Sequence, residues 1–205
     1  AELSVDSVSL NAITDISFGR NSSITALGEA GSLALRSIDG SVILPSSAVI
    51  SAVNEISIDS AGLVKNGTID AGRVMKLGSG NLLIADTGHE NQVQDIARDL
   101  GIEQWMVLGE DFINSFAGLD AVWITGRESI GFLGPVSLSA SNMLVADTPV
   151  LGSIGADSSD TLRLTASTVS LLNSDEKAAN QNPFGGRHGR MTVSADQMQF
   201  GHANG

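Results

Sequence analysis

The amino-acid sequence predicts an all-β solenoid, in which short strands wind into coils that stack on one another. The first of three observations is a ten-residue pattern that occurs at residues 136–145, 162–171 and 191–200. The second is the density of short apolar runs separated by tight turns elsewhere in the chain. The third is composition, because 23 glycines, 4 prolines and only 4% aromatic residues suit tight corners between strands of small and aliphatic residues.

The threefold pattern reads apolar, polar, apolar, Ser or Thr, Ala, two polar residues, apolar, any residue, apolar. Its alternation places the apolar side chains on one face of a strand. Ala140, Ala166 and Ala195 continue that face at a position that favours a small side chain. The next apolar residue comes three positions later instead of two, so a corner between two short strands is predicted. Such a unit, recurring about every two to three dozen residues, is typical of a solenoid.

The N-terminal half repeats this theme less regularly. Turns at Asp39-Gly40 and Asn66-Gly67 punctuate short apolar runs, and the loops are too short for helical crossovers. An antiparallel sandwich has similar strand spacing, but it usually has longer strands and more aromatic core residues. The predicted strands lie around residues 3–10, 33–35, 42–44, 49–50, 56–58, 63–64, 68–69 and 74–77.

Residues 86–104 interrupt the strand pattern. Apolar residues recur there at helical spacing, and Gly101 is a suitable C-terminal stop. We therefore predict one short amphipathic helix at 90–100, as an excursion from the solenoid. The residues at helical spacing are Val93, Ile96, Ala97 and Leu100.

Most aromatic residues of the chain fall within 105–132, where strands are predicted at 105–108, 121–124 and 129–132. One interpretation is a platform on which sugars stack. The other, which we favour, is that these rings fill a wider turn of the core and cover the helix. The residues are Trp105, Phe112, Phe116, Trp123 and Phe132.

The segment 173–190 lies between the last two repeats and is rich in Asn, Gly and charged residues. Its polarity predicts a surface loop. The loop carries Arg187, His188 and Arg190, which suit an anion or a polyanionic glycan, although solvated loop residues are the simpler interpretation. Together with Trp123, these three residues form the predicted glycan or partner surface.

The densest cluster of potential metal ligands is Asp86-Thr87-Gly88-His89-Glu90. We favour a turn that leads into the helix, with carboxylates near its positive end. Glu110 and Asp111 are the nearest candidate carboxylate pair, but adjacent residues point in different directions. The sequence holds no Gly-x-Ser-x-Gly motif. We therefore predict no catalytic, cofactor or metal-binding residue and no enzymatic activity.

The charge and the residue types that are missing limit the classes of partner. The formal net charge is −12 and the basic residues are scattered, which disfavours nucleic acid and anionic membrane surfaces. The absence of Cys excludes disulfides and thiolate metal sites. No apolar run approaches the length of a membrane span. Both ends of the sequence look cut, so we expect residues 1–205 to be a single β-helix segment of a larger protein.

Residues 136–147 and 162–173 resemble the shaft repeats of filamentous-haemagglutinin-like exoproteins, as do residues 116–124 running into 129–132. These are giant surface proteins of Gram-negative bacteria that are exported by two-partner secretion. The resemblance implies a right-handed parallel β-helix that serves as a rigid stalk for adhesion or for delivery of a toxin tip. It also implies a secreted, cell-surface location, an outer-membrane secretion partner and surface glycans or receptors as candidate ligands. No functional residue is carried over from the family.

Two other classes of function stay open. Polysaccharide lyases, hydrolases and depolymerases with a β-helix place carboxylates and basic residues together on one face, whereas the basic residues of this chain are few and scattered. A glycan-binding module without chemistry would use the segments 105–132 and 173–190.

Overall fold

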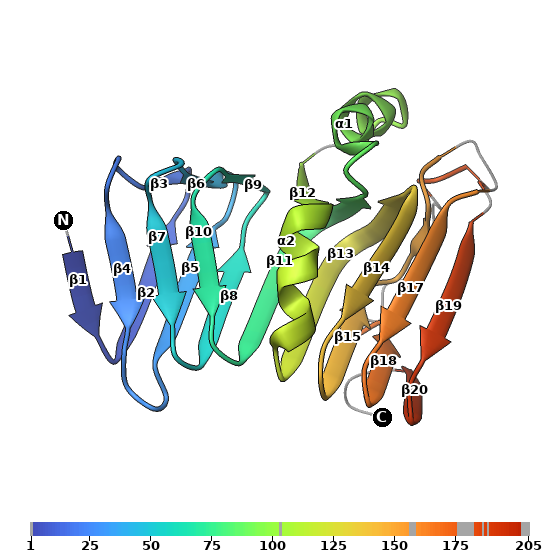
Figure 1. The fold of residues 1–205 in the computed structure, drawn as a ribbon. Helices are drawn as coiled ribbons and strands as arrows, with labels where there is room; N and C mark the ends of the chain where they lie inside the picture. The colour runs from blue at the N-terminus through green and yellow to red at the C-terminus, as the bar shows by residue number, and fades with distance from the viewer. Residues whose placement is uncertain are drawn as a thin grey trace. The chain divides into compact units, whose positions relative to one another are not determined.

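The computed structural model describes residues 2–102, 104–155, 159–175, 183–185, 187 and 189–201. It is an all-β parallel solenoid of about seven turns in which only 10% of the chain is helical (Figure 1). The predicted parallel solenoid is thereby confirmed. The chain divides into two compact units, Ala1–Gly78 and Ser79–Gly205.

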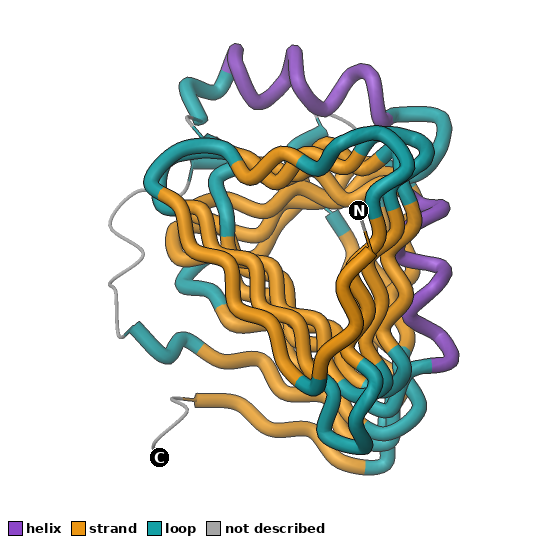
Figure 2. The backbone as a smooth tube through the Cα atoms, turned by 90° about the vertical axis from the view of Figure 1, so that its left-hand side faces the viewer, coloured by secondary structure: helices purple, strands orange, loops and turns teal. Residues whose placement is uncertain are grey.

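Three parallel sheets build the first unit, and each coil passes through them in turn. Figure 2 looks along the direction in which the coils stack and shows the strands of successive coils one behind another. The first sheet contains β1 (Glu2–Val5), β4 (Ser23–Ala26), β7 (Val49–Ala52) and β10 (Thr68–Ala71). The second contains β2 (Ser7–Ala12), β5 (Ser32–Ser37), β8 (Glu55–Asp59) and the start of β11 (Val74–Ala85). The third contains β3 (Ile16–Ser17), β6 (Ser41–Leu44) and β9 (Gly62–Lys65).

Apolar residues of the first unit stack in columns, because the strands keep the same register from coil to coil. Val8 pairs with Leu33, Leu33 with Ile56, and Ile56 with Met75. All four side chains are buried. Burial of each such side chain contributes roughly 1.5–3 kcal/mol, and the neighbouring coils supply the cover that a lone coil lacks.

In the second unit, one parallel sheet contains the end of β11, β13 (Ala121–Leu133), β15 (Met143–Asp147), β18 (Thr168–Leu172) and β20 (Gln197–Gly201). A second sheet contains β14 (Pro135–Ser139), β17 (Thr161–Thr165) and β19 (Arg190–Ser194). Two further strands attach to the first sheet. They are β12 (Trp105–Gly109), which pairs with the end of β11, and β16 (Leu151–Ser153), which pairs with the end of β13.

The threefold sequence pattern forms three strand–corner–strand units, β14–β15, β17–β18 and β19–β20, as predicted. Leu138 pairs with Leu164, and Leu164 pairs with Val193, so equivalent positions of the pattern stack on one another. Ala140 and Ala166 are buried at the corners that follow β14 and β17. The template therefore defines which side chains face the core.

The β19–β20 unit differs from the other two because its apolar side chains are exposed. Among the described strands, β19 pairs only with β17 and β20 pairs only with β18. Met191, Met198 and Phe200 are consequently exposed, and the side chain of Phe200 keeps 71% of its surface accessible.

The strands predicted at 121–124 and 129–132 are the two halves of one strand, β13. Residues 121–125 pair with β15, whereas residues 130–132 pair with β16. The break expected between residues 124 and 129 is therefore no gap between strands. It is the place where the continuous strand β13 changes its pairing partner from β15 to β16. This change brings β16 beside the end of β13, where the cavity described below is found.

The helix predicted at 90–100 is confirmed as α1 (Glu90–Asp99), with Val93 and Ala97 buried. Gly101, which follows it, has a φ of +67° and so adopts the left-handed conformation that ends many helices. Two helices were not predicted, α2 (Glu110–Asn114) and the 3-10 helix η1 (Ser115–Gly118). Each is too short to show a helical period in the sequence. Within the described ranges, no helix has the length and apolar character needed to cross a membrane.

Candidate functional site

The residues between β11 and α1 meet the start of α2, and this junction gathers the acidic cluster singled out from the sequence. Glu110, the first residue of α2, accepts two hydrogen bonds from Thr87 at one carboxylate oxygen. The distances to Oε2 are 2.7 Å from Thr87 Oγ1 and 3.0 Å from Thr87 N. The hydrogen bond from the Thr87 hydroxyl, followed by that from its backbone amide, lowers the pKa of Glu110 below its ordinary value.

Glu90, the first residue of α1, completes the junction from the opposite side. Its Oε1 accepts a hydrogen bond of 3.1 Å from the backbone amide of Glu110. That amide belongs to the first turn of α2, where N–H groups have no partner within the helix. Glu90 therefore provides a hydrogen-bond acceptor for the first backbone amide of α2. Glu110 in turn accepts hydrogen bonds from Thr87, in the turn that precedes α1.

His89 contacts Asp86 through Nδ1 and Oδ1, and the backbone amide of His89 donates a 3.0 Å hydrogen bond to the Asp86 carbonyl. These contacts close the turn that leads into α1. In the part of the chain that the structure describes, no three His, Asp or Glu side chains are grouped so that they could hold a metal ion. The carboxylates of Glu90 and Glu110 accept hydrogen bonds from the chain itself, which gives the junction a structural role.

A second polar network lies where β16 ends, and sequence reasoning missed it. Asp160 is buried, and its Oδ1 accepts a 2.9 Å hydrogen bond from the backbone amide of Gly134. Its Oδ2 contacts the Ser153 hydroxyl, which in turn accepts a 3.1 Å hydrogen bond from the amide of Gly155. Both oxygens of this carboxylate are therefore used to join the turn after β13 to the turn after β16.

The aromatic segment 105–132 belongs mainly to the core. Phe112 and Phe116 pack edge to face with ring centroids 5.0 Å apart, and both are buried, as is Phe132. Trp105 is partly buried and packs against the apolar cluster that contains Val93 of α1. The burial of Phe112, Phe116 and Phe132 and the packing of Trp105 agree with the core interpretation.

The four residues of the predicted glycan or partner surface lie in different surroundings. Trp123 is half-buried on β13, and Arg190 is exposed at the start of β19. Arg187 is half-buried, and its Nη1 donates a hydrogen bond to the carbonyl of Ile154. His188 lies outside the described residues.

Phe184 is a residue of the predicted polar loop whose role the sequence analysis missed. Its side chain is only 1% exposed and belongs to the same apolar cluster as Leu83, Val93 and Ile154. A lone aromatic residue within a polar stretch was the available signal. Phe184 packs into the core of the second unit, and Arg187 donates a hydrogen bond to Ile154. These two contacts attach this segment to the second unit.

A cavity of about 360 Å³ opens beside this fastened segment. Its walls come from β13, β15, β16, β18, β19 and the segment that carries Arg187. Of the three described members of the predicted surface, Arg187 lines the cavity, whereas Trp123 and Arg190 do not. The residues that line the cavity include Phe132, Leu151, Ser153, Leu171, Arg187 and Met191.

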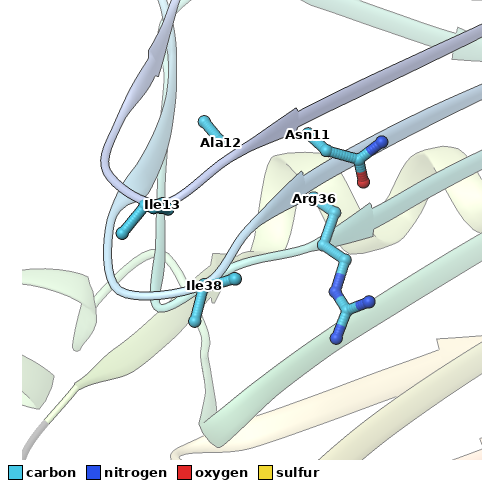
Figure 3. Close-up of a pocket in the computed structure, with 5 residues that line it drawn as sticks. All are labelled: Asn11, Ala12, Ile13, Arg36 and Ile38. Carbon is cyan, nitrogen blue, oxygen red and sulfur yellow. The ribbon is translucent and has the colours of Figure 1, made fainter.

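The first unit has a smaller pocket of about 240 Å³ at the ends of β2 and β5 (Figure 3). Arg36, which lines it, forms a salt bridge of 3.7 Å from Nε to Oδ2 of Asp59, so an acidic partner already balances its charge. Figure 3 shows Asn11 and Arg36 on neighbouring strands and two isoleucines at the bends that follow. The lining residues are Asn11, Ala12, Ile13, Arg36 and Ile38.

Comparison with known proteins finds no family model, no curated protein and no solved structure that matches the chain.

Proposed function

We propose that the chain is a structural shaft segment of a large secreted bacterial surface protein that is used in adhesion or in toxin delivery. The observation that carries the proposal is the parallel, in-register stacking of coils within each unit. The resemblance of residues 136–147 and 162–173 to the shaft repeats of filamentous-haemagglutinin-like exoproteins supports the biological setting. Export through an outer-membrane partner and contact with surface glycans or receptors belong to the same proposal.

The stacking suits a protein whose task is to extend and resist bending. Each coil contacts only its neighbours, so coils add length without requiring a larger core. Hydrogen bonds between parallel strands join each coil to the next, so a load along the stack is shared by all hydrogen bonds between two coils. The net charge of −12 favours solubility, and the absence of Cys means that folding after export needs no disulfide formation.

Location on the cell surface is tested with antibodies raised against residues 1–205. We expect them to label intact, unpermeabilised cells that produce the protein, and we expect external protease to remove the label. An antibody against a cytosolic protein of the same cells is the control for leakage. Labelling that appears only after permeabilisation would overturn the surface assignment.

A structural role is separated from polysaccharide degradation by incubating the protein with a panel of acidic polysaccharides. We expect no release of unsaturated or reducing ends. Turnover that is lost on substitution of one carboxylate of the candidate pair, Glu110→Gln or Asp111→Asn, would replace the shaft proposal with an enzymatic function.

A further inference from the structure

We propose that the cavity around Arg187 in the second unit binds a small amphipathic anion, namely a compact apolar molecule that carries one carboxylate. The proposal concerns a binding site on the shaft and does not depend on where the parent protein is located. Three features support the proposal: β16 pairs with a strand on one side only, the cavity walls are mainly apolar, and Arg187 places a positive charge in the wall.

The cavity exists because β16 has a strand partner on one side only. Among the described residues, Leu151–Ser153 pairs with the end of β13 and with no later strand. The segment that contains Phe184 and Arg187 lies near β16 instead, as shown by the contact between Arg187 and Ile154. The small side chain of Ala146 leaves further space in the wall. A volume of about 360 Å³ falls in the range of small-molecule sites.

The walls suit an apolar body better than a sugar. Phe132, Leu151, Leu171 and Met191 contribute aromatic, aliphatic and thioether surface. The two hydroxyl groups of the lining are already used inside the protein. Ser153 contacts Asp160, and Thr148 donates a 3.0 Å hydrogen bond to the carbonyl of Val150. A glycan would therefore bring many hydroxyl groups to a site with few polar partners for them.

The charge of the site specifies an anion. Among the described residues that line the cavity, Arg187 alone is charged. A guanidinium has five N–H donors in one plane, so the hydrogen bond from Nη1 to Ile154 orients the group and leaves capacity for a carboxylate. Apolar walls strengthen such a charge-assisted contact because they exclude water. In the first unit, by contrast, Arg36 is paired with Asp59.

The test is titration calorimetry of the 205-residue chain with 2-naphthoate and with its neutral analogue 2-naphthalenemethanol. We expect the carboxylate to bind at least about tenfold more tightly than the alcohol. Arg187→Gln should remove this preference, whereas Arg163→Gln, at an exposed arginine of β17, should keep it. Equal affinity for the two compounds, or no binding of either, would overturn the proposal without any variant.

The position of binding is tested by methyl NMR of the methionines, which number 5 in the chain. Naphthoate should shift the methyl signal of Met191, which lines the cavity, and should leave that of Met75 in the core of the first unit unchanged. The two signals are assigned with Met191→Leu and Met75→Leu. Binding that leaves the Met191 signal in place would mean that the anion binds elsewhere and would refute the assignment of this cavity.

Discussion

Gly131 of β13 lies directly opposite Gly152 of β16 in the parallel pairing of the two strands. Neither residue has a side chain, and the ring of Phe184 packs against both. A Cβ atom at Gly131 would lie 3.2 Å from Cε1 of Phe184, and one at Gly152 would lie 3.0 Å from its Cδ2. At Gly131 the same Cβ would lie closer still to Cγ2 of Ile154, at 2.5 Å, and to Cδ2 of Leu83, at 2.9 Å, so the paired glycines make room for the Phe184 ring together with these two side chains. The ring anchors an otherwise polar segment to the core.

Truncation of this anchor should destabilise the second unit. Phe184→Ala is expected to cost about 3–5 kcal/mol, because it removes a buried ring and leaves a cavity over the two glycines. Phe200→Ala is the matched control, since Phe200 is exposed and should change stability by less than about 0.5 kcal/mol. Urea denaturation followed by circular dichroism measures both variants. Equal losses at the two positions would contradict the proposed anchoring role.

A charge placed inside the repeats should unfold the second unit. Leu164 is completely buried between Leu138 and Val193, so Leu164→Asp would bury a carboxylate among aliphatic side chains. We expect a loss of at least about 3 kcal/mol. Arg163→Asp, at the adjacent exposed position, places the same side chain in water and should be tolerated. A thermal melt of Leu164→Asp that matched that of the unsubstituted chain would show that the inward and outward faces of β17 are assigned incorrectly.

Acid should weaken the junction between α1 and α2. The pKa of Glu110 is lower in the folded protein than its ordinary value of 4.5, because Thr87 donates hydrogen bonds to the carboxylate. The resulting stabilisation is present above pH 4.5 and is lost as the pH falls through the lowered pKa. Thr87→Val should raise the pKa of Glu110 toward 4.5, whereas Thr87→Ser retains the hydroxyl and should not. Carboxyl carbon NMR during an acid titration measures the change, and an unaltered titration in Thr87→Val would refute the hydrogen-bond explanation.

Two glycines with similar backbone conformations should respond differently to alanine. Gly101 and Gly134 have φ values of +67° and +78°, so alanine at either position is strained by about 1 kcal/mol. A Cβ at Gly134 would also lie 2.7 Å from Oδ1 of Asp86 and 2.8 Å from Nδ1 of His89, whereas one at Gly101 would meet nothing within 4 Å.

Gly134→Ala should therefore cost clearly more than Gly101→Ala in the free energy of unfolding, by about 1–3 kcal/mol. Removing the obstruction with His89→Ala should recover part of that difference. Similar losses for both glycines would show that the turn before α1 moves aside without cost.

Much of the fold was predictable because its signals are local. Alternation with a period of two marks strands, and the Ala corner in residues 136–145 and 162–171 marks the bends between them. Helix α1 was predictable for the same reason, since ten residues are enough to show its apolar face. In each case the information lies within one short window of sequence.

The features that could not be predicted from the sequence depend on contacts between distant parts of the chain. Helix α2 has only five residues, and its first amide is satisfied by Glu90, twenty positions earlier. Asp160 meets Gly134 across twenty-six positions. The glycine pair that receives Phe184 exists only after β13 and β16 have paired. No single window of sequence contains both partners of any of these contacts, so the acidic junction and the cavity at Arg187 emerged only from the structure.

The constant register between successive coils has a consequence for how genes of this kind change. Duplication or loss of one complete coil leaves the remaining inward columns, such as Val8 with Leu33, correctly aligned. A single-residue insertion inside a strand instead turns its core side chains toward solvent. Chain length is therefore free to vary in whole-coil increments, while insertions of arbitrary length are accommodated at bends, as where α1 is inserted between β11 and β12.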